Sequence, residues 1–161
     1  MRPTGEIMDF ISAFGIAPAA RTSGLAALIL CALAANAPLP PTVEVSVTGL
    51  RSTKGQLLVC LTTKASAFPD CSRDKGSVRM AVKAVDAARF DIHAPANGTY
   101  AIAVVHDENG NNKMDKAIFL PKEGFGFSRN PAIAMGPPSF KSASFTVAGD
   151  MHQSIKMKYM L

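Results

Sequence analysis

The chain has 161 residues and a net charge of +5, and 48% of its residues are hydrophobic whereas 18% are charged. This balance is typical of a globular protein and excludes an intrinsically disordered one. The length predicts a single domain. The basic residues are scattered singly, without a basic run interleaved with aromatic residues, so no nucleic-acid partner is expected.

An uncharged apolar stretch near the N-terminus has the features of an export signal. No charged residue occurs from Thr22 to Val43, and the apolar stretch Gly24–Ala35 follows Arg21. A basic residue before a short apolar core is typical of a signal helix, and this core is too short to span a membrane comfortably. Residues 1–37 are therefore predicted to be a signal peptide, and the alternative is an anchor that stays attached and gives the only membrane contact. We expect an exported protein, either periplasmic or secreted.

Two cysteines, Cys60 and Cys71, remain after residues 1–37. An even count in an oxidising compartment favours a disulfide between them, which would contribute roughly 3 kcal/mol to stability. Two free thiols and a metal pair are the alternatives. The sequence has no CxxC motif and no Cys/His cluster that would favour zinc.

Seven segments after the proline-rich lead-in at residues 38–41 are predicted to be strands. Thr42–Thr48 alternates valine with polar residues, which is typical of a strand buried on one face, whereas Thr99–His106 is apolar on both faces and is predicted to be central. The other five predicted strands are Gln56–Thr62, Val78–Val85, Arg89–His93, Ala143–Val147 and Ser154–Met160. The predicted fold is all-β: a two-sheet antiparallel β-sandwich of the immunoglobulin-like or prealbumin-like kind over residues 42–161.

A long segment at residues 116–141 lacks a strand pattern but contains four phenylalanines, among them Phe125 and Phe127. Loops of this length are uncommon in compact domains and are often functional, and the phenylalanines argue against disorder. One interpretation is a lid packed over one end of the sandwich. The other is a binding loop in which Phe125, Phe127 and Ser128 contact an unknown envelope or extracellular partner.

Three blocks of sequence resemble a known bacterial family. They are YAIAVVHDENGNNKMD (Tyr100–Asp115), PKEGFGFSRN (Pro121–Asn130) and GPPSFKSASFTV (Gly136–Val147). In this order and spacing they resemble the family catalogued as domain of unknown function 2141, over roughly Val43–Leu161. The resemblance implies a small exported β-sandwich without assigned activity or established catalytic residues. The family often has glycine where this chain has Asn112, a residue that tolerates the left-handed conformation better than most.

The acidic loop after the predicted central strand has part of a calcium-binding register. Its candidate ligands, at positions 1, 3, 5, 7 and 9 of an EF-hand-like loop, are Asp107, Asn109, Asn111, the Lys113 carbonyl and Asp115. Position 12 is Ile118 rather than glutamate, so Glu108 or Glu123 would have to complete the site, and calcium would bind weakly, with Kd of order 10⁻⁴–10⁻³ M. The alternative is a polar turn in which Asp and Asn side chains cap their own backbone.

The sequence leaves three functions open. The first is a non-catalytic exported module that binds an envelope or extracellular partner. The second is a domain in which calcium has a purely structural role. The third is a hydrolase that uses His106 and Asp107, with Ser128 near them in space. The chain has no GxSxG, HExxH or P-loop motif, and adjacent strand residues such as His106 and Asp107 point to opposite faces. No catalytic residue is therefore assigned.

Overall fold

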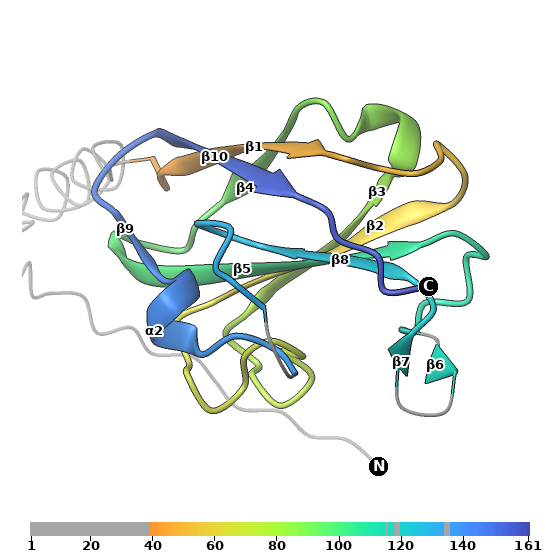
Figure 1. Ribbon diagram of the computed structural model, residues 1–161. Coiled ribbons are helices and arrows are strands. Elements are labelled where there is room, and N and C mark those ends of the chain that lie inside the picture. The colour runs from red at the N-terminus through yellow and green to blue at the C-terminus, as the bar shows by residue number, and fades with distance from the viewer. Residues whose placement is uncertain (1–38, 115, 118–119, 134–135) are drawn as a thin grey trace, which may run out of the picture. The chain divides into compact units, whose positions relative to one another are not determined.

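A computed structural model describes residues 39–114, 116–117, 120–133 and 136–161, and the predicted signal helix lies outside them. The described part is mostly β structure with very little helix (Figure 1). Its first elements are β1 (Thr42–Thr48), β2 (Gln56–Thr62), β3 (Val78–Lys83), the 3-10 turn η1 (Ala84–Asp86), β4 (Phe90–His93) and β5 (Gly98–Asp107). The remaining elements are β6 (Lys116–Ala117), β7 (Leu120–Pro121), β8 (Gly124–Phe127), the short helix α2 (Phe140–Ala143), β9 (Phe145–Val147) and β10 (Met151–Lys156).

The strands form two main sheets and one small hairpin. The smaller main sheet has the order β10-β1-β4, and the larger has the order β3-β2-β5-β8, with β9 paired to the first residues of β5. β6 and β7 pair only with each other. The prediction of a mostly β domain with two sheets is therefore confirmed.

The main core lies between the two sheets and follows the alternation of the strands. Val43, Val45 and Val47 of β1 are buried, as the alternating pattern predicts. Their partners in the core include Leu57 of β2 and Ile155 of β10. Each fully buried side chain of this size stabilises the fold by about 1.5–3 kcal/mol relative to an exposed one.

β5 is buried on both faces, and its position inside the larger sheet confirms the prediction of a central strand. Tyr100, Ile102 and Val104 face the main core. Ala101 and Ala103 face a second hydrophobic cluster on the outer side of the same sheet. The other members of this second cluster are Phe125, Phe127 and Ala143, with Phe68, Met114, Ile133 and Phe140 packed around them.

The prediction of a purely antiparallel arrangement was wrong at one pair. β1 runs parallel to β10, with Val45 opposite Gln153 and Val47 opposite Ile155. An alternating strand buries the same face whether its neighbour runs parallel or antiparallel, so the sequence pattern of β1 carries no information on direction. A parallel pair needs a long connection rather than a hairpin, and here the connection includes almost the whole domain.

The prediction of a strandless segment at residues 116–141 was also wrong, because β8 lies within it and pairs with β5. The sequence of β8, Gly-Phe-Gly-Phe, does not look like a strand because glycine is depleted in strands. The glycines are required by close packing: a Cβ added to Gly126 would lie 2.7 Å from Cγ2 of Ile155 and 2.9 Å from Sδ of Met157. The phenylalanines point to the opposite face.

The limits of the last two predicted strands differ from the structure. β9 begins at Phe145, since Ala143 belongs to α2, and the Ser139 side chain caps this helix by accepting the Ser142 N–H at 3.2 Å. β10 is Met151–Lys156 rather than Ser154–Met160. With β8, the two main sheets contain eight strands rather than about seven.

Cys60 and Cys71 form a disulfide, with their Cα atoms 6.2 Å apart. Cys60 lies on β2 and Cys71 lies in the connection to β3, and both are buried. The predicted pairing is confirmed. The bond fixes the middle of the β2–β3 connection to the outer face of the larger sheet.

Candidate functional site

The acidic turn at the end of β5 is organised around the carboxylate of Asp107, which is fully buried. Its Oδ1 atom accepts main-chain N–H groups from Gly110 at 2.8 Å and Asn111 at 3.1 Å. Its Oδ2 atom accepts the N–H of Asn112 at 2.8 Å and Nε2 of Gln56 at 2.9 Å. One carboxylate thus receives four N–H donors and fixes the turn against the neighbouring strand β2.

The donors around Asp107 control its ionisation. Burial acts to raise the pKa of this carboxyl group, but the Gln56 side chain and the N–H groups of residues 110–112 outweigh it, and the pKa lies below its usual value. Hydrogen bonds to the charged form favour that form. Asp107 is therefore an ionised structural group at neutral pH.

The other candidate calcium ligands continue the same pattern of local hydrogen bonds. The side-chain oxygen of Asn109 accepts the N–H of Asn111 at 3.0 Å, and the side-chain oxygen of Asn111 accepts the N–H of Lys113 at 2.9 Å. Asn112 has φ of 61°, so it adopts the left-handed conformation for which glycine is usual. Asp115 lies outside the described residues. Asp and Asn side chains therefore cap their own backbone here, as the polar-turn interpretation predicts.

Both glutamates named as the missing calcium ligand interact with Arg51. Glu108 is held by Arg51 and Ser52, at 2.9 Å from Arg51 Nε and 2.7 Å from the Ser52 hydroxyl. Glu123 is buried in the next segment of the chain, where its charge acts on Arg51. Within the described ranges, no group of three or more His, Cys, Asp and Glu side chains is arranged to hold a metal ion.

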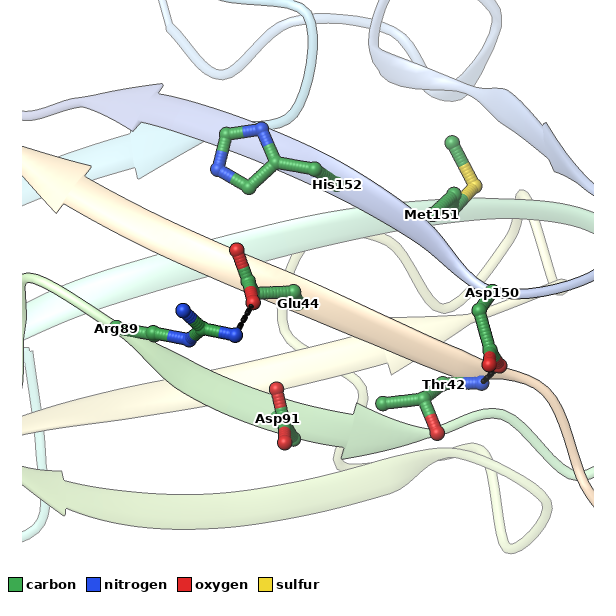
Figure 2. Close-up of a pocket in the computed structure, with 7 residues that line it drawn as sticks. All are labelled: Thr42, Glu44, Arg89, Asp91, Asp150, Met151 and His152. Carbon is green, nitrogen blue, oxygen red and sulfur yellow. Dashed lines mark hydrogen bonds and ion pairs between the residues drawn. The ribbon is translucent and has the colours of Figure 1, made fainter.

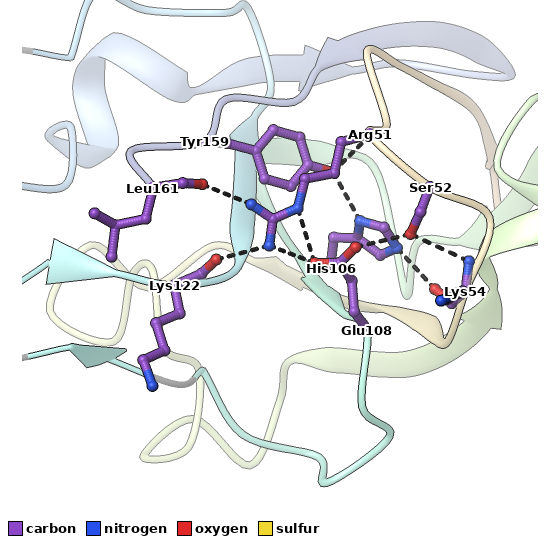
Figure 3. A network of polar contacts seen from close by, with 8 residues as sticks. All are labelled: Arg51, Ser52, Lys54, His106, Glu108, Lys122, Tyr159 and Leu161. Atoms are coloured by element: carbon purple, nitrogen blue, oxygen red, sulfur yellow. Dashed lines mark hydrogen bonds and ion pairs between the residues drawn. The ribbon is translucent and has the colours of Figure 1, made fainter.

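His106 is fully buried and has both ring nitrogens engaged (Figure 3). Nε2 lies 2.9 Å from the carbonyl oxygen of Lys54, which can only accept, so Nε2 carries the hydrogen. Nδ1 is hydrogen-bonded to the hydroxyl group of Tyr159, at 2.7 Å. The imidazole connects the β1–β2 connection with the C-terminal segment and faces away from Asp107, as adjacent strand residues do.

Arg51 is the centre of a polar network that no sequence motif indicates. Its guanidinium group donates to Glu108, to the carbonyl oxygen of Lys122 at 3.0 Å and to the main-chain oxygen of Leu161 at 2.6 Å (Figure 3). It also lies over the ring of Tyr159, 4.6 Å from its centre, in a cation–π contact. The ion pair with Arg51 lowers the pKa of Glu108, because it stabilises the carboxylate. A single arginine in a polar turn does not indicate from sequence that several distant segments will bind it.

The structure buries the three residues predicted to contact a partner. Phe125 and Phe127 are each 5% exposed and Ser128 is fully buried. The Ser128 hydroxyl accepts the N–H of Ile102 at 2.9 Å and donates to the carbonyl oxygen of Ala143 at 2.6 Å. These residues hold β8 and α2 against β5, and little of their surface is exposed to a partner in this structure.

Ser128 and His106 are not brought together. Ser128 bonds the main chain of Ile102, whereas His106 lies four residues farther along β5, opposite Gly124. Four residues of strand correspond to about 13 Å. The three polar groups of the hydrolase hypothesis, His106, Asp107 and Ser128, thus hold three separate points of the main chain.

A shallow polar depression of about 490 Å³ lies on the outer face of the smaller sheet (Figure 2). Two contacts join residues of its lining across the strands. Glu44 pairs with Arg89, and Asp150 accepts the N–H of Thr42 at 2.7 Å. His152 lies 3.0 Å from the hydroxyl of Ser46, just beyond the depression. This is the polar, solvated face expected of a sheet that is buried on one side only.

No helix among the described residues has the length and apolar character needed to cross a membrane. Comparison with curated proteins and with solved structures finds no match. A family model does match, over residues 45–156, and its description is an uncharacterized protein conserved in bacteria (DUF2141). The match covers most of both main sheets, the acidic turn and β8. The chain therefore belongs to this bacterial family, domain of unknown function 2141, as its three sequence blocks indicate.

Proposed function

We propose that the protein is an exported, non-catalytic β-sandwich module, of the immunoglobulin-like or prealbumin-like kind, that binds an envelope or extracellular partner. One observation carries the non-catalytic part: His106, Asp107 and Ser128 each hold main-chain or neighbouring groups through hydrogen bonds. A general base must reach its substrate within hydrogen-bond distance. The imidazole of His106 and the hydroxyl of Ser128 are buried and already hydrogen-bonded to other groups of the protein. The signal-like segment at residues 1–37 and the Cys60–Cys71 disulfide support export.

Two experiments test this proposal. A fusion of residues 1–37 to alkaline phosphatase should give phosphatase activity in intact bacteria, since that enzyme needs disulfides that form outside the cytoplasm. An inactive, cytoplasmic fusion would overturn export. The purified protein should show no turnover in ester, phosphate-ester and glycoside screens. Turnover that disappears in the His106→Asn variant, while Asp91→Asn on the outer face keeps it, would overturn the non-catalytic assignment.

A second proposed function is structural calcium binding by the turn after β5. The observation that favours it is the conformation of Asn112, which is left-handed at the position where EF-hand-like loops use glycine. Asp107, Asn109, Asn111, the Lys113 carbonyl and Asp115 would supply oxygen ligands. Calcium at ten times its Kd would stabilise the native state by about 1.4 kcal/mol.

The calcium proposal is tested by thermal unfolding of the purified protein. The melting temperature should be higher in 10 mM calcium chloride than in chelator, by roughly 4–6 °C on the size scaling of domains. The same concentration of magnesium is the control for ionic effects. Asp115→Asn should reduce the calcium effect, and Asp86→Asn, at an exposed position outside the turn, should leave it unchanged. Equal melting temperatures in calcium and chelator would overturn the proposal.

A further inference from the structure

Some edge strands of the two sheets have their outward main-chain groups hydrogen-bonded to other segments, whereas others do not. The outer edge of β10 is occupied by Asn130, whose Nδ2 donates to the Ser154 carbonyl at 2.9 Å and whose Oδ1 accepts the Lys156 N–H at 2.7 Å. The outer edge of β8 pairs with the C-terminal segment through Phe125 and Lys158, with hydrogen bonds of 2.9 and 2.8 Å. These contacts close one side of the domain.

β3 is different, because it ends the larger sheet and its main chain bonds only to β2 among the described residues. It is the longest strand with such an edge, at six residues, whereas the edge strand β4 has four. β3 has no proline, the residue that removes a hydrogen-bond donor from an edge strand. Its outward N–H and C=O groups are therefore a template for another strand.

The side chains of β3 specify what kind of strand would fit. Val78, Met80 and Val82 point toward the main core, and the first two are only partly buried at its rim. Arg79, Ala81 and Lys83 point to the other face and are exposed. An added strand would need apolar residues opposite Val78, Met80 and Val82. Opposite Arg79 and Lys83 it would need carboxylates, since opposite charges on facing residues stabilise a pair of strands.

A second copy of this chain fits this edge poorly in one of the two antiparallel registers that keep Val78, Met80 and Val82 on the core side. In the antiparallel register centred on Ala81, Arg79 of each copy would face Lys83 of the other, and like charges directly opposite each other destabilise a pair. The net charge of +5 opposes self-association further. An acidic segment from a different molecule meets neither obstacle.

We propose that β3 binds an extended acidic segment by β-strand addition, in which apolar residues alternate with Asp or Glu. This inference rests on the proposed function as a binding module, and it names the surface and the class of partner. Main-chain hydrogen bonds give affinity in this mode of recognition, and the alternate side chains give specificity. The partner is a protein with an exposed or unstructured stretch of this alternating composition.

The test uses the purified protein and a fluorescently labelled ten-residue peptide of alternating valine and glutamate, with a valine–lysine peptide of the same length as its matched control. The valine–glutamate peptide should bind saturably and the lysine peptide should not. In the double variant Arg79→Glu/Lys83→Glu, binding of the glutamate peptide should fall at least about tenfold, and the lysine peptide should gain affinity. The control variant Arg73→Glu/Lys75→Glu changes the net charge equally in the exposed loop before β3 and should bind like the native protein.

Amide exchange locates the peptide, because the outward N–H groups of residues 78–83 should become protected when it binds. The assignment to β3 would be overturned if the glutamate peptide does not bind saturably or if both double variants lose its binding equally. It would also be overturned if the peptide protects the amides of another edge strand. Concentration-dependent dimers that disappear in Arg79→Glu/Lys83→Glu would overturn it in favour of a second copy. These results are distinct from failure of the proposed function, which would appear as His106-dependent turnover or as a cytoplasmic protein.

Discussion

Replacement of Asp107 by asparagine tests whether the turn depends on one carboxylate. The substitution hardly changes the size of the side chain but turns one acceptor oxygen into an NH₂ donor. Four N–H groups reach this carboxylate, two at each oxygen, so two donors lose their acceptor whichever way the amide points. A buried donor left unsatisfied costs about 1–3 kcal/mol. Residues 110–112 are exposed, which lets water replace part of the loss, so we expect a decrease of about 2–3 kcal/mol in total.

The assay is urea denaturation at pH 7, supported by thermal melting. The midpoint should decrease at constant m-value, and Tm should decrease by roughly 10 °C. Asp86→Asn is the matched control, because Asp86 is exposed, and its effect should stay within about 0.5 kcal/mol. A loss below about 0.5 kcal/mol for Asp107→Asn would refute the reasoning, since the four contacts would then contribute no net stability.

The pH dependence of the same variant gives an independent check. The pKa of Asp107 is lower in the folded protein than in the unfolded chain, so the carboxylate contributes stability above the unfolded value of about 3.9. This contribution is lost as the pH falls through the lower, folded pKa. The difference in stability between the native protein and Asp107→Asn should therefore be constant from pH 7 to about pH 5 and decrease below about pH 4. A difference that grows on acidification would contradict the assigned direction.

Three further substitutions test other parts of the fold. Phe127→Ala should cost about 3–5 kcal/mol in denaturant unfolding because the ring is buried, whereas the exposed control Val85→Ala should be nearly neutral, and equal effects would contradict the burial of β8. The double variant Cys60→Ala/Cys71→Ala should lose roughly 3 kcal/mol, and an unchanged urea midpoint under oxidising conditions would exclude a stabilising disulfide. Tyr159→Phe should cost about 1–2 kcal/mol because it removes the hydroxyl group bound to the buried imidazole, and no change in stability would show that this hydrogen bond has no net effect.

Sequence patterns predicted the parts of the fold that depend on local alternation. Thr42–Thr48 and Gln56–Thr62 have the predicted limits, because valine and leucine at alternate positions bury one face of a strand in any two-sheet domain. β8 could not be recognised in the same way. Its glycines are required by Ile155, Met157 and Tyr159, which lie about 30 residues later in the chain, and no window around Gly124–Phe127 contains that information.

The sequence predicted where the candidate site lies but only part of what its residues do. The preference of Asp and Asn for turns indicated the turn at residues 107–113. The same preference predicted that these side chains accept hydrogen bonds from their own backbone, as they do here. The role of Arg51 depends on three segments that meet only in the folded domain, at Glu108, Lys122 and Leu161. The binding role assigned to Phe125 and Phe127 rested on apolar composition, which does not distinguish an exposed patch from a core.

The parallel pairing of β1 with β10 has a consequence for the order of folding. The contact between Thr42 and Asp150 joins residues 108 positions apart, so β1 can pair with β10 only after nearly the whole chain is present. Bringing together such distant segments costs about 4 kcal/mol of chain entropy before any contact compensates for it. Folding should therefore begin with the pairing of β2 and β3, which are consecutive in the chain, and the pairing of β1 with β10 should form last. A chain truncated before Met151 would leave one edge of β1 without its partner strand, so the last eleven residues are needed to complete the pairing of the first strand.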